Sequence, residues 1–314
     1  MEVFKVLKYF SFFSYYPTFE EIYTFYPKAI TRKQLKIQLL TLVRKKRIYY
    51  EKKSQRYTLG GYSIRDLKSQ ILNVKTKFVI SQKKISSWRF RLYIKLLSLF
   101  SQIKLIGLSG SIAMMNAKEE DDIDLFIITS QNRLFTGRFI AIILAKILGI
   151  HRGYQDIQLI KKLKNQKDKK LDELIHFKNK VCLNLFFDQK NLKIPSKKHS
   201  LYVAHEVLQM KPLVNKDNIY ERFLKTNRWI FSFFPNARRI SHFKSTFSNQ
   251  SPSLNFKNGK LRKNFLDWLE NHLKKLQLRL IKRHQTTEII SHDQLWFHPD
   301  DFEKKIENYL NCEK

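Results

Sequence analysis

Cysteine is scarce in this 314-residue sequence, which contains Cys182 and Cys312 and no others. Two cysteines cannot build the disulfide framework of a small secreted domain, and these two do not lie at metal-ligand spacing. The low cysteine content fits a reducing compartment. No internal repeat is evident, and the length allows two or three domains with a sizeable core.

Long apolar runs are also missing. The longest apolar stretch, residues 139–150, is shorter than the roughly 20 residues that span a bilayer, and it contains Lys146. The N-terminus is rich in Phe and Tyr, but Glu2, Lys5 and Lys8 interrupt it and no small-residue cleavage site follows. We therefore expect no signal peptide, no transmembrane segment and a cytoplasmic location.

Acidic residues are few compared with basic ones. The chain has 60 Lys and Arg against 27 Asp and Glu, a formal net charge of +33. Such a field attracts polyanions, nucleic acid first and acidic membrane surfaces second. The bias of an AT-rich genome would raise Glu as well as Lys, so it does not explain the asymmetry. Nucleic acid is therefore the expected partner.

Two short apolar segments within residues 103–129 enclose a pair of aspartates. Residues 103–108 and 125–128 are aliphatic, which predicts two strands. Asp122 and Asp124 enter the second strand two residues apart, so their carboxylates leave one face about 7 Å apart. Adjacent carboxylates repel one another unless a cation lies between them, which is how Mg²⁺ sites are built. The alternative is a solvated acidic turn, but Asp is depleted in strands.

A glycine turn precedes the aspartates. Gly110 allows close approach of the backbone, and Ser111 begins a helical stretch, 112–117, whose free N–H groups favour a phosphate. Ten residues separate Ser111 from Asp122. A Gly-Ser pair, ten residues and Asp-x-Asp in an apolar strand resemble the signature of the DNA polymerase β-like nucleotidyltransferase superfamily.

The resemblance implies an α+β fold and a metal-dependent transferase. Asp122 and Asp124 would carry the catalysis by holding Mg²⁺ or Mn²⁺, and Gly110 and Ser111 would bind the β- and γ-phosphates of a nucleoside triphosphate. An acceptor hydroxyl would attack the α-phosphorus and release pyrophosphate.

The superfamily usually places a third carboxylate on the next strand, which is expected here at residues 181–188. The central position of that strand is Asn184, and Asp188 at its end is the alternative. An amide ligates a metal weakly and cannot accept a proton. The sequence departs from the family pattern at this position.

The first 62 residues predict three helices followed by a two-stranded hairpin. Capping-box pairs begin the second and third helices, at Thr18 with Glu21 and at Thr31 with Gln34. The expected elements are helices at 3–13, at 19–25 and after Thr31, and strands at 48–51 and 56–59.

Three helices and a hairpin resemble the winged helix-turn-helix family. The resemblance implies a helix in a DNA groove, with Arg32, Lys33 and Lys36 facing phosphates or bases. The alternative is a small helical bundle with a solvated basic face that contacts protein or positions the enzyme.

Residues 63–198 are expected to form the catalytic domain, with its core motif at 107–129. A helix is predicted at 75–100, with an apolar stripe that packs on the sheet. A second helix, 133–148, would cover the other side, and the lysine-rich residues 161–180 read as an exposed loop. The stripe comprises Phe78, Ile85, Trp88, Leu92 and Leu96.

Residues 199–314 are expected to form a helical accessory domain. Helices are predicted at 201–210, 220–234 and 261–284, with residues 239–260 as a linker. The last of these helices has an apolar stripe that we interpret as core rather than as a membrane-surface face, and all nine histidines as structural or surface residues. The stripe comprises Leu261, Phe265, Trp268, Leu269, Leu276 and Leu280.

The sequence therefore predicts an Mg²⁺-dependent nucleotidyltransferase whose charge favours RNA or DNA as the acceptor. Two alternatives stay open. One is a catalytically inactive nucleic-acid-binding or regulatory protein on the same fold, and the other is a toxin-like transferase that modifies tRNA or protein.

Overall fold

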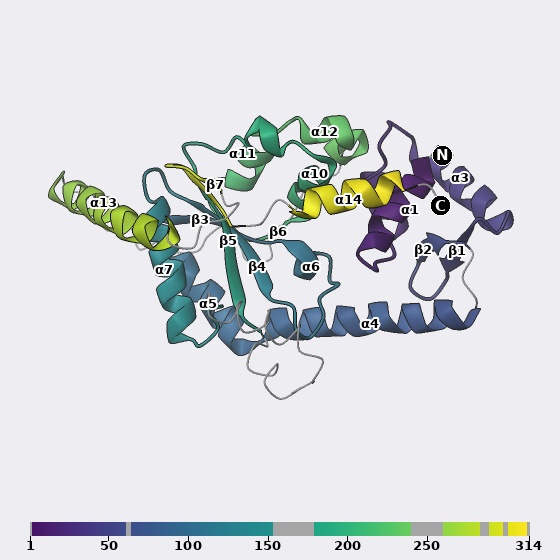
Figure 1. Cartoon of the computed structure of the whole chain (residues 1–314), viewed down its shortest axis with the longest axis horizontal. Coiled ribbons are helices and arrows are strands. Elements are labelled where there is room, and N and C mark those ends of the chain that lie inside the picture. The colour runs from purple at the N-terminus through teal and green to yellow at the C-terminus, as the bar shows by residue number, and fades with distance from the viewer. Residues whose placement is uncertain are drawn as a thin grey trace.

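The computed structural model describes residues 2–60, 64–152, 179–239, 260–282, 289–297 and 301–312. It is an α+β structure with one mixed six-stranded sheet and a separate two-stranded antiparallel sheet. Helices lie on both faces of the larger sheet, and the smaller sheet lies at the far end of a long helix (Figure 1). No helix of the described residues is long and apolar enough to cross a membrane.

The elements predicted within residues 1–62 are confirmed. Both capping boxes form, with Thr18 bonded to Glu21 and Thr31 to Gln34, so two helices begin where the sequence indicates. The strands pair antiparallel, with Ile48 opposite Leu59. The elements are α1 (Glu2–Phe12), α2 (Phe19–Thr24), α3 (Arg32–Arg44), β1 (Ile48–Glu51) and β2 (Arg56–Leu59).

The single helix predicted at 75–100 is wrong, because the chain breaks at Ser87. Helix α4 (Ile64–Ser86) is followed by α5 (Trp88–Leu99), and Ser87 between them has ψ 137°. The break shifts the helical phase, so Phe78 and Trp88 of the predicted stripe are exposed, Trp88 by 66%. The buried face of α5 comprises Phe90, Tyr93, Ile94 and Leu97.

The six-stranded sheet has the order β6-β3-β4-β5-β8-β7. Strands β4 and β5 run parallel, and the other described pairs run antiparallel. The three strands predicted for the catalytic domain are confirmed, whereas β6, β7 and β8 were not predicted. The strands are β3 (Ile103–Leu108), β4 (Ile123–Thr129), β5 (Val181–Asp188), β6 (Lys211–Asn215), β7 (Ile289–Ile290) and β8 (Gln294–Trp296).

Alternate residues of β4 enter two different hydrophobic clusters. Leu125 and Ile127 face the cluster under α5 and α7 (Leu134–Ile147). The predicted helix at 133–148 therefore forms, but its predicted place on the other side of the sheet is wrong, because α7 packs beside α5 and Tyr93 of α5 donates to the Ala141 carbonyl. Phe126 and Ile128 face the opposite cluster, where the Phe126 ring lies 5.2 Å from that of Phe223. Each sheet face is therefore covered by helices.

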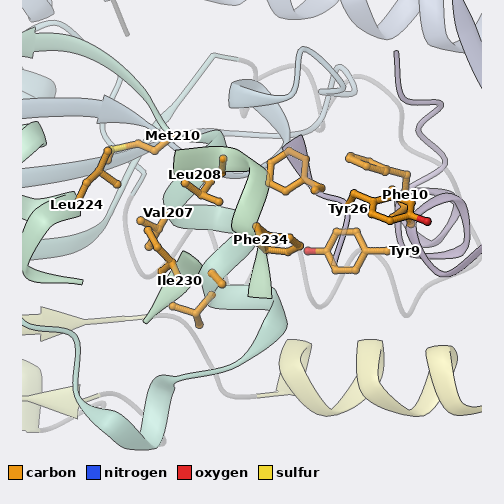
Figure 2. Close-up of a cluster of buried hydrophobic side chains, with 14 of the residues drawn as sticks. Tyr9, Phe10, Tyr26, Val207, Leu208, Met210, Leu224, Ile230 and Phe234 are labelled. Carbon is orange, nitrogen blue, oxygen red and sulfur yellow. The ribbon is translucent and has the colours of Figure 1, made fainter. Parts of the chain in front are cut away.

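The second cluster is continuous from the sheet to the N-terminal helices. It passes through α10 (Leu201–Gln209), and Figure 2 shows Tyr9 and Phe10 of α1 beside that helix and Phe234. Residues 2–60, which contain the N-terminal helices and the hairpin, therefore share a hydrophobic core with α10. Helix α14 (Asp301–Asn311) packs against α1 as well.

The C-terminal region is not wholly helical, since it supplies β6, β7 and β8. The helix predicted at 220–234 is also two helices, α11 (Ile219–Thr226) and α12 (Ile230–Phe233). The buried Asn227 separates them, because its side chain bonds the backbone of Leu192 and Ile194. Two 3₁₀ turns, Ser196–Lys198 and Pro235–Arg239, flank this region.

Helix α13 (Lys260–Lys282) confirms the predicted helix at 261–284, but the prediction of a core stripe is wrong for four of its members. Phe265, Trp268, Leu276 and Leu280 are each more than half exposed. The opposite side of α13 packs on α7 instead. The loop expected at 161–180 and the linker expected at 239–260 fall almost wholly outside the described residues.

Candidate functional site

The glycine turn lies directly against the second strand of the motif. After β3 the chain turns at Ser109 into α6 (Gly110–Ala113), and the Ser109 N–H donates to the Asp124 carbonyl at 3.0 Å. Gly110 has φ +62°, and a Cβ on it would lie 2.8 Å from Asp124 Oδ2. Only glycine combines this backbone conformation with such a close carboxylate. The turn and Asp124 therefore form one site.

Asn184 contacts Asp124 from the next strand. Its Nδ2 donates to Asp124 Oδ1 at 2.7 Å, and its Oδ1 accepts from the Cys182 thiol at 2.7 Å. The β4–β5 register shifts so that Asn184 has no residue opposite it, as at a β-bulge. The bulge re-aims this side chain toward Asp124. The candidate third position is therefore occupied by an amide.

Asp188, the other candidate for that position, lies elsewhere. It pairs with Thr129 at the far end of β4, five residues beyond the position of Asp124 and about 16 Å away along the strand. Its carboxylate accepts the backbone N–H groups of Asn132 and Lys190. These bonds give Asp188 a structural role in the β4–α7 connection, and the structure does not bring it to the site.

Asp122 and Ser111 have other partners. The buried carboxylate of Asp122 forms an ion pair with Arg152. Ser111 Oγ donates to Asp121 Oδ2 at 3.1 Å, and the Lys118 N–H donates to the same oxygen. Asp121 thus holds the acidic turn against the start of α6.

A buried lysine holds that turn from the other side. Lys84 of α4 donates its Nζ to the carbonyl oxygens of Glu119 and Asp121, at 2.8 and 2.6 Å. Its side chain is almost fully buried. The end of α4 therefore fixes the acidic turn that leads into β4.

Glu206 is a site residue that the sequence did not reveal. Helix α10 places its Oε2 3.1 Å from the Gly110 N–H, which donates to it. Gln209 Nε2 donates to Oε1 at 2.6 Å. No motif marks this residue, since only the packing of α10 over the sheet brings it to the glycine turn.

The two carboxyl groups that flank the turn hold protons near neutral pH. Burial, with the charges of Glu206 and Asp121 added, raises the pKa of Asp124 from 3.8 to about 7. Burial likewise raises the pKa of Glu206 from 4.5 to about 7. Buried carboxyl groups without a compensating cation behave in this way. The chain as a whole has a net charge of +33, but the carboxyl groups of Asp124, Glu206 and Asp121 make the surroundings of the turn acidic.

The donor set fits a hard cation that is completed by a substrate. Among the described residues, no three His, Cys, Asp or Glu side chains form a ready metal site. Mg²⁺ commonly takes one or two carboxylates plus substrate phosphates and waters, so Asp122 and Asp124 are chemically sufficient. Asp122 would first have to release Arg152.

The predicted nucleic-acid contacts on α3 are divided. Arg32 pairs with Glu20, and its guanidinium lies 4.6 Å from the Tyr23 ring centroid. Lys33 and Lys36 are exposed. Two of the three predicted cations therefore point to solvent, and the third is bound to its own domain.

Comparison of the chain with models of protein families, with curated proteins and with solved structures found no match.

Proposed function

We propose that the chain is a polymerase β-like nucleotidyltransferase that moves a nucleotide from a nucleoside triphosphate to an acceptor hydroxyl. The observation that carries the proposal is the packing of the Gly110 turn on Asp124, with the Ser109 N–H on the Asp124 carbonyl. This geometry puts a phosphate-binding backbone turn next to a potential metal ligand.

The Gly110 N–H already binds an anionic group, the Glu206 carboxylate. An amide oriented toward one carboxylate oxygen is equally suited to a phosphate oxygen. We infer that the triphosphate displaces Glu206 from Gly110 and that Ser111 assists through its hydroxyl. The displaced carboxylate stays on α10, beside Asp124.

Asp122 and Asp124 would hold Mg²⁺ or Mn²⁺, which supplies neutralisation of the negative charge that develops on the triphosphate. The acceptor oxygen bonds to the α-phosphorus, the bond from that phosphorus to the β-bridging oxygen breaks, and pyrophosphate leaves. The acceptor proton needs a base. Asn184 cannot serve, and we assign this role to Glu206, whose pKa of about 7 suits proton transfer near neutral pH.

Nucleic acid is the proposed acceptor. The net charge of +33 and the exposed lysines of α3, Lys33 and Lys36, favour a polyanion over a neutral small molecule. We propose that the three helices and hairpin at residues 1–62 act as a winged-helix-like module that contacts it.

A second candidate function is nucleic-acid binding without chemistry. The ion pair between Asp122 and Arg152 favours it, because it neutralises a metal ligand without a metal. Asn184 in the place of a third carboxylate points the same way.

Transfer of label decides between the two candidates. The protein is incubated with Mg²⁺, each α-labelled nucleoside triphosphate and total RNA. Label should enter RNA, and Asp124→Asn should reduce the rate by about 10³-fold or more, since a lost metal ligand costs several kcal/mol.

The matched control is Asp217→Asn, because Asp217 is an exposed carboxylate that pairs with Lys104 outside the site. Its rate should equal that of the wild type. Glu206→Gln should slow transfer while the triphosphate still binds. Undiminished transfer by Asp124→Asn would contradict the assignment, and absence of transfer with every nucleotide would favour the binding protein.

A further inference from the structure

A groove lies between the hairpin and helix α4, away from the glycine turn. The space there is a groove of about 450 Å³, which is the size of a small-ligand pocket. Figure 1 shows the hairpin beside this helix. The groove presents four aromatic rings, those of Tyr16, Tyr49, Tyr57 and Phe78.

Two of these rings, those of Tyr49 and Phe78, are available to a ligand. Tyr49 of β1 is 42% exposed and Phe78 of α4 is 39% exposed. Arg56 also lines the groove, where it donates to the Tyr16 carbonyl and pairs with Glu21, so its role there is structural. An exposed aromatic surface of this kind suits a flat, π-rich group.

The charge around the groove is positive. Glu51 is the one carboxylate among the residues that line it. Arg56 and the exposed Lys75 line the groove. The exposed Lys52 and Lys53 lie in the hairpin turn between two further lining residues, Glu51 and Ser54. Cations beside exposed aromatic rings are the arrangement that binds single-stranded nucleic acid, whose phosphates meet the cations while its bases stack on the rings.

We propose that this groove binds a base of a single-stranded nucleic acid. A double helix is disfavoured because its bases stack on one another and leave no face for these rings. An acidic peptide would satisfy the cations, but it would not explain why the rings stay exposed.

Helix α4 connects the groove to the candidate active site. Lys75 lines the groove, and Lys84 holds the acidic turn at Asp121. Lys84 lies nine positions after Lys75, which is about 14 Å along the helix. A strand seated in the groove would therefore reach the glycine turn with its terminal hydroxyl within a few nucleotides. This last step, the strand as acceptor, rests on the proposed function; the binding itself does not.

The test is fluorescence anisotropy of a labelled 12-nucleotide RNA with the full chain and no nucleoside triphosphate. Tyr49→Ala and Phe78→Ala should each weaken binding by about 10-fold, because a base loses its stacking partner. Tyr49→Phe should retain wild-type affinity. The control is Trp88→Ala, since Trp88 is an exposed aromatic residue on α5 outside the groove.

Three results would overturn the inference. They are unchanged affinity in both alanine variants, equal affinity of the wild type for the RNA and its duplex, and displacement of the RNA by an acidic peptide of matched charge in the wild type but not in Tyr49→Ala.

Transfer measurements separate the two proposals. Asp124→Asn should lose transfer and keep its affinity for the RNA, whereas Tyr49→Ala should raise the KM for the RNA and leave kcat unchanged. Transfer retained by Asp124→Asn would contradict the proposed function, but it would not affect the inference that the groove binds RNA. A lower kcat with unchanged RNA affinity in Tyr49→Ala would overturn the inference that the groove binds RNA.

Discussion

Asn184 Nδ2 donates to Asp124 Oδ1 across 2.7 Å and so joins β5 to β4 beside the glycine turn. The Asn184 amide supplies a hydrogen-bond donor to the Asp124 carboxyl group. It does so without adding a third carboxylate beside Asp124 and Glu206. An Asn184→Asp substitution would leave three carboxyl groups competing for protons. The third carboxyl group near the turn is that of Glu206, which comes from helix α10 and accepts the Gly110 N–H.

The Gly110→Ala substitution should destabilise the protein and abolish transfer. Alanine at φ +62° costs about 1–2 kcal/mol, and its Cβ would in addition push Asp124 away from the turn. Urea unfolding of the variant measures the total loss of free energy of unfolding.

Gly149→Ala is the matched control for that measurement. Gly149 has φ +67°, but nothing lies within 4 Å of the Cβ it would acquire. The free energy of unfolding of Gly149→Ala should therefore fall by the conformational cost alone, about 1 kcal/mol. Equal losses in the two variants would mean that the contact between Gly110 and Asp124 contributes nothing.

Acid should destabilise the protein through His205. This buried ring stacks on Phe25 at 3.8 Å, and burial lowers its pKa from 6.5 to about 3. Below pH 6.5 the unfolded chain binds a proton that the folded chain does not, so the contribution of His205 to stability is lost as pH falls.

The measurement is the free energy of unfolding of the wild type and of His205→Phe between pH 7.5 and 4.5. The difference should change in favour of the variant by about 1.4 kcal/mol per pH unit below pH 6.5. The exposed His272 provides the control, as His272→Phe should track the wild type across the range. A pH-independent difference for His205→Phe would contradict the prediction.

Local sequence signals predicted the N-terminal region and the core of the sheet. Capping boxes at Thr18 and Thr31 and the aliphatic runs of β3, β4 and β5 are short-range patterns, and the structure follows them. The motif likewise predicted that Gly110 and Asp124 would meet, since the chain between them is short.

The misses at Asn227 and Glu206 have a long-range cause. The breaks at Ser87 and Asn227 involve no Gly or Pro, and Asn227 is fixed by backbone groups more than 30 residues away. Strand β6 contains Pro212, which is tolerated because β6 lies at the sheet edge. Glu206 enters the site only because α10 packs across the sheet, and no local pattern carries that information.

Glu270 should be among the most important residues for stability in α13. This buried carboxylate accepts the N–H groups of Phe135 and Thr136, both at 2.8 Å, and so caps the beginning of α7. Glu270→Ala leaves these two N–H groups and the Thr136 hydroxyl, which also donates to Glu270, without an acceptor, and it should cost about 2–4 kcal/mol in chemical denaturation. Asp267→Ala should cost less than about 1 kcal/mol, because Asp267 forms a partly exposed ion pair with Arg133. The reverse order would show that α13 is held to α7 by something other than this cap.

Arg152 should compete with a metal ion for Asp122. The ion pair neutralises Asp122 in the present structure, so a cation can use this carboxylate only after the guanidinium leaves. Arg152→Gln should therefore bind Mn²⁺ several-fold more tightly in titration calorimetry, and it should be less stable than the wild type when Mn²⁺ is removed.

The matched control for Arg152 is Arg133→Gln, which removes an arginine of similar pairing from Asp267, outside the site. Its affinity for Mn²⁺ should not change. Weaker binding of Mn²⁺ by Arg152→Gln would mean that the arginine orients Asp122 for the metal rather than replacing it. In that case Asp122 and Arg152 would belong to one preorganised site, and the ion pair would no longer favour the catalytically inactive alternative.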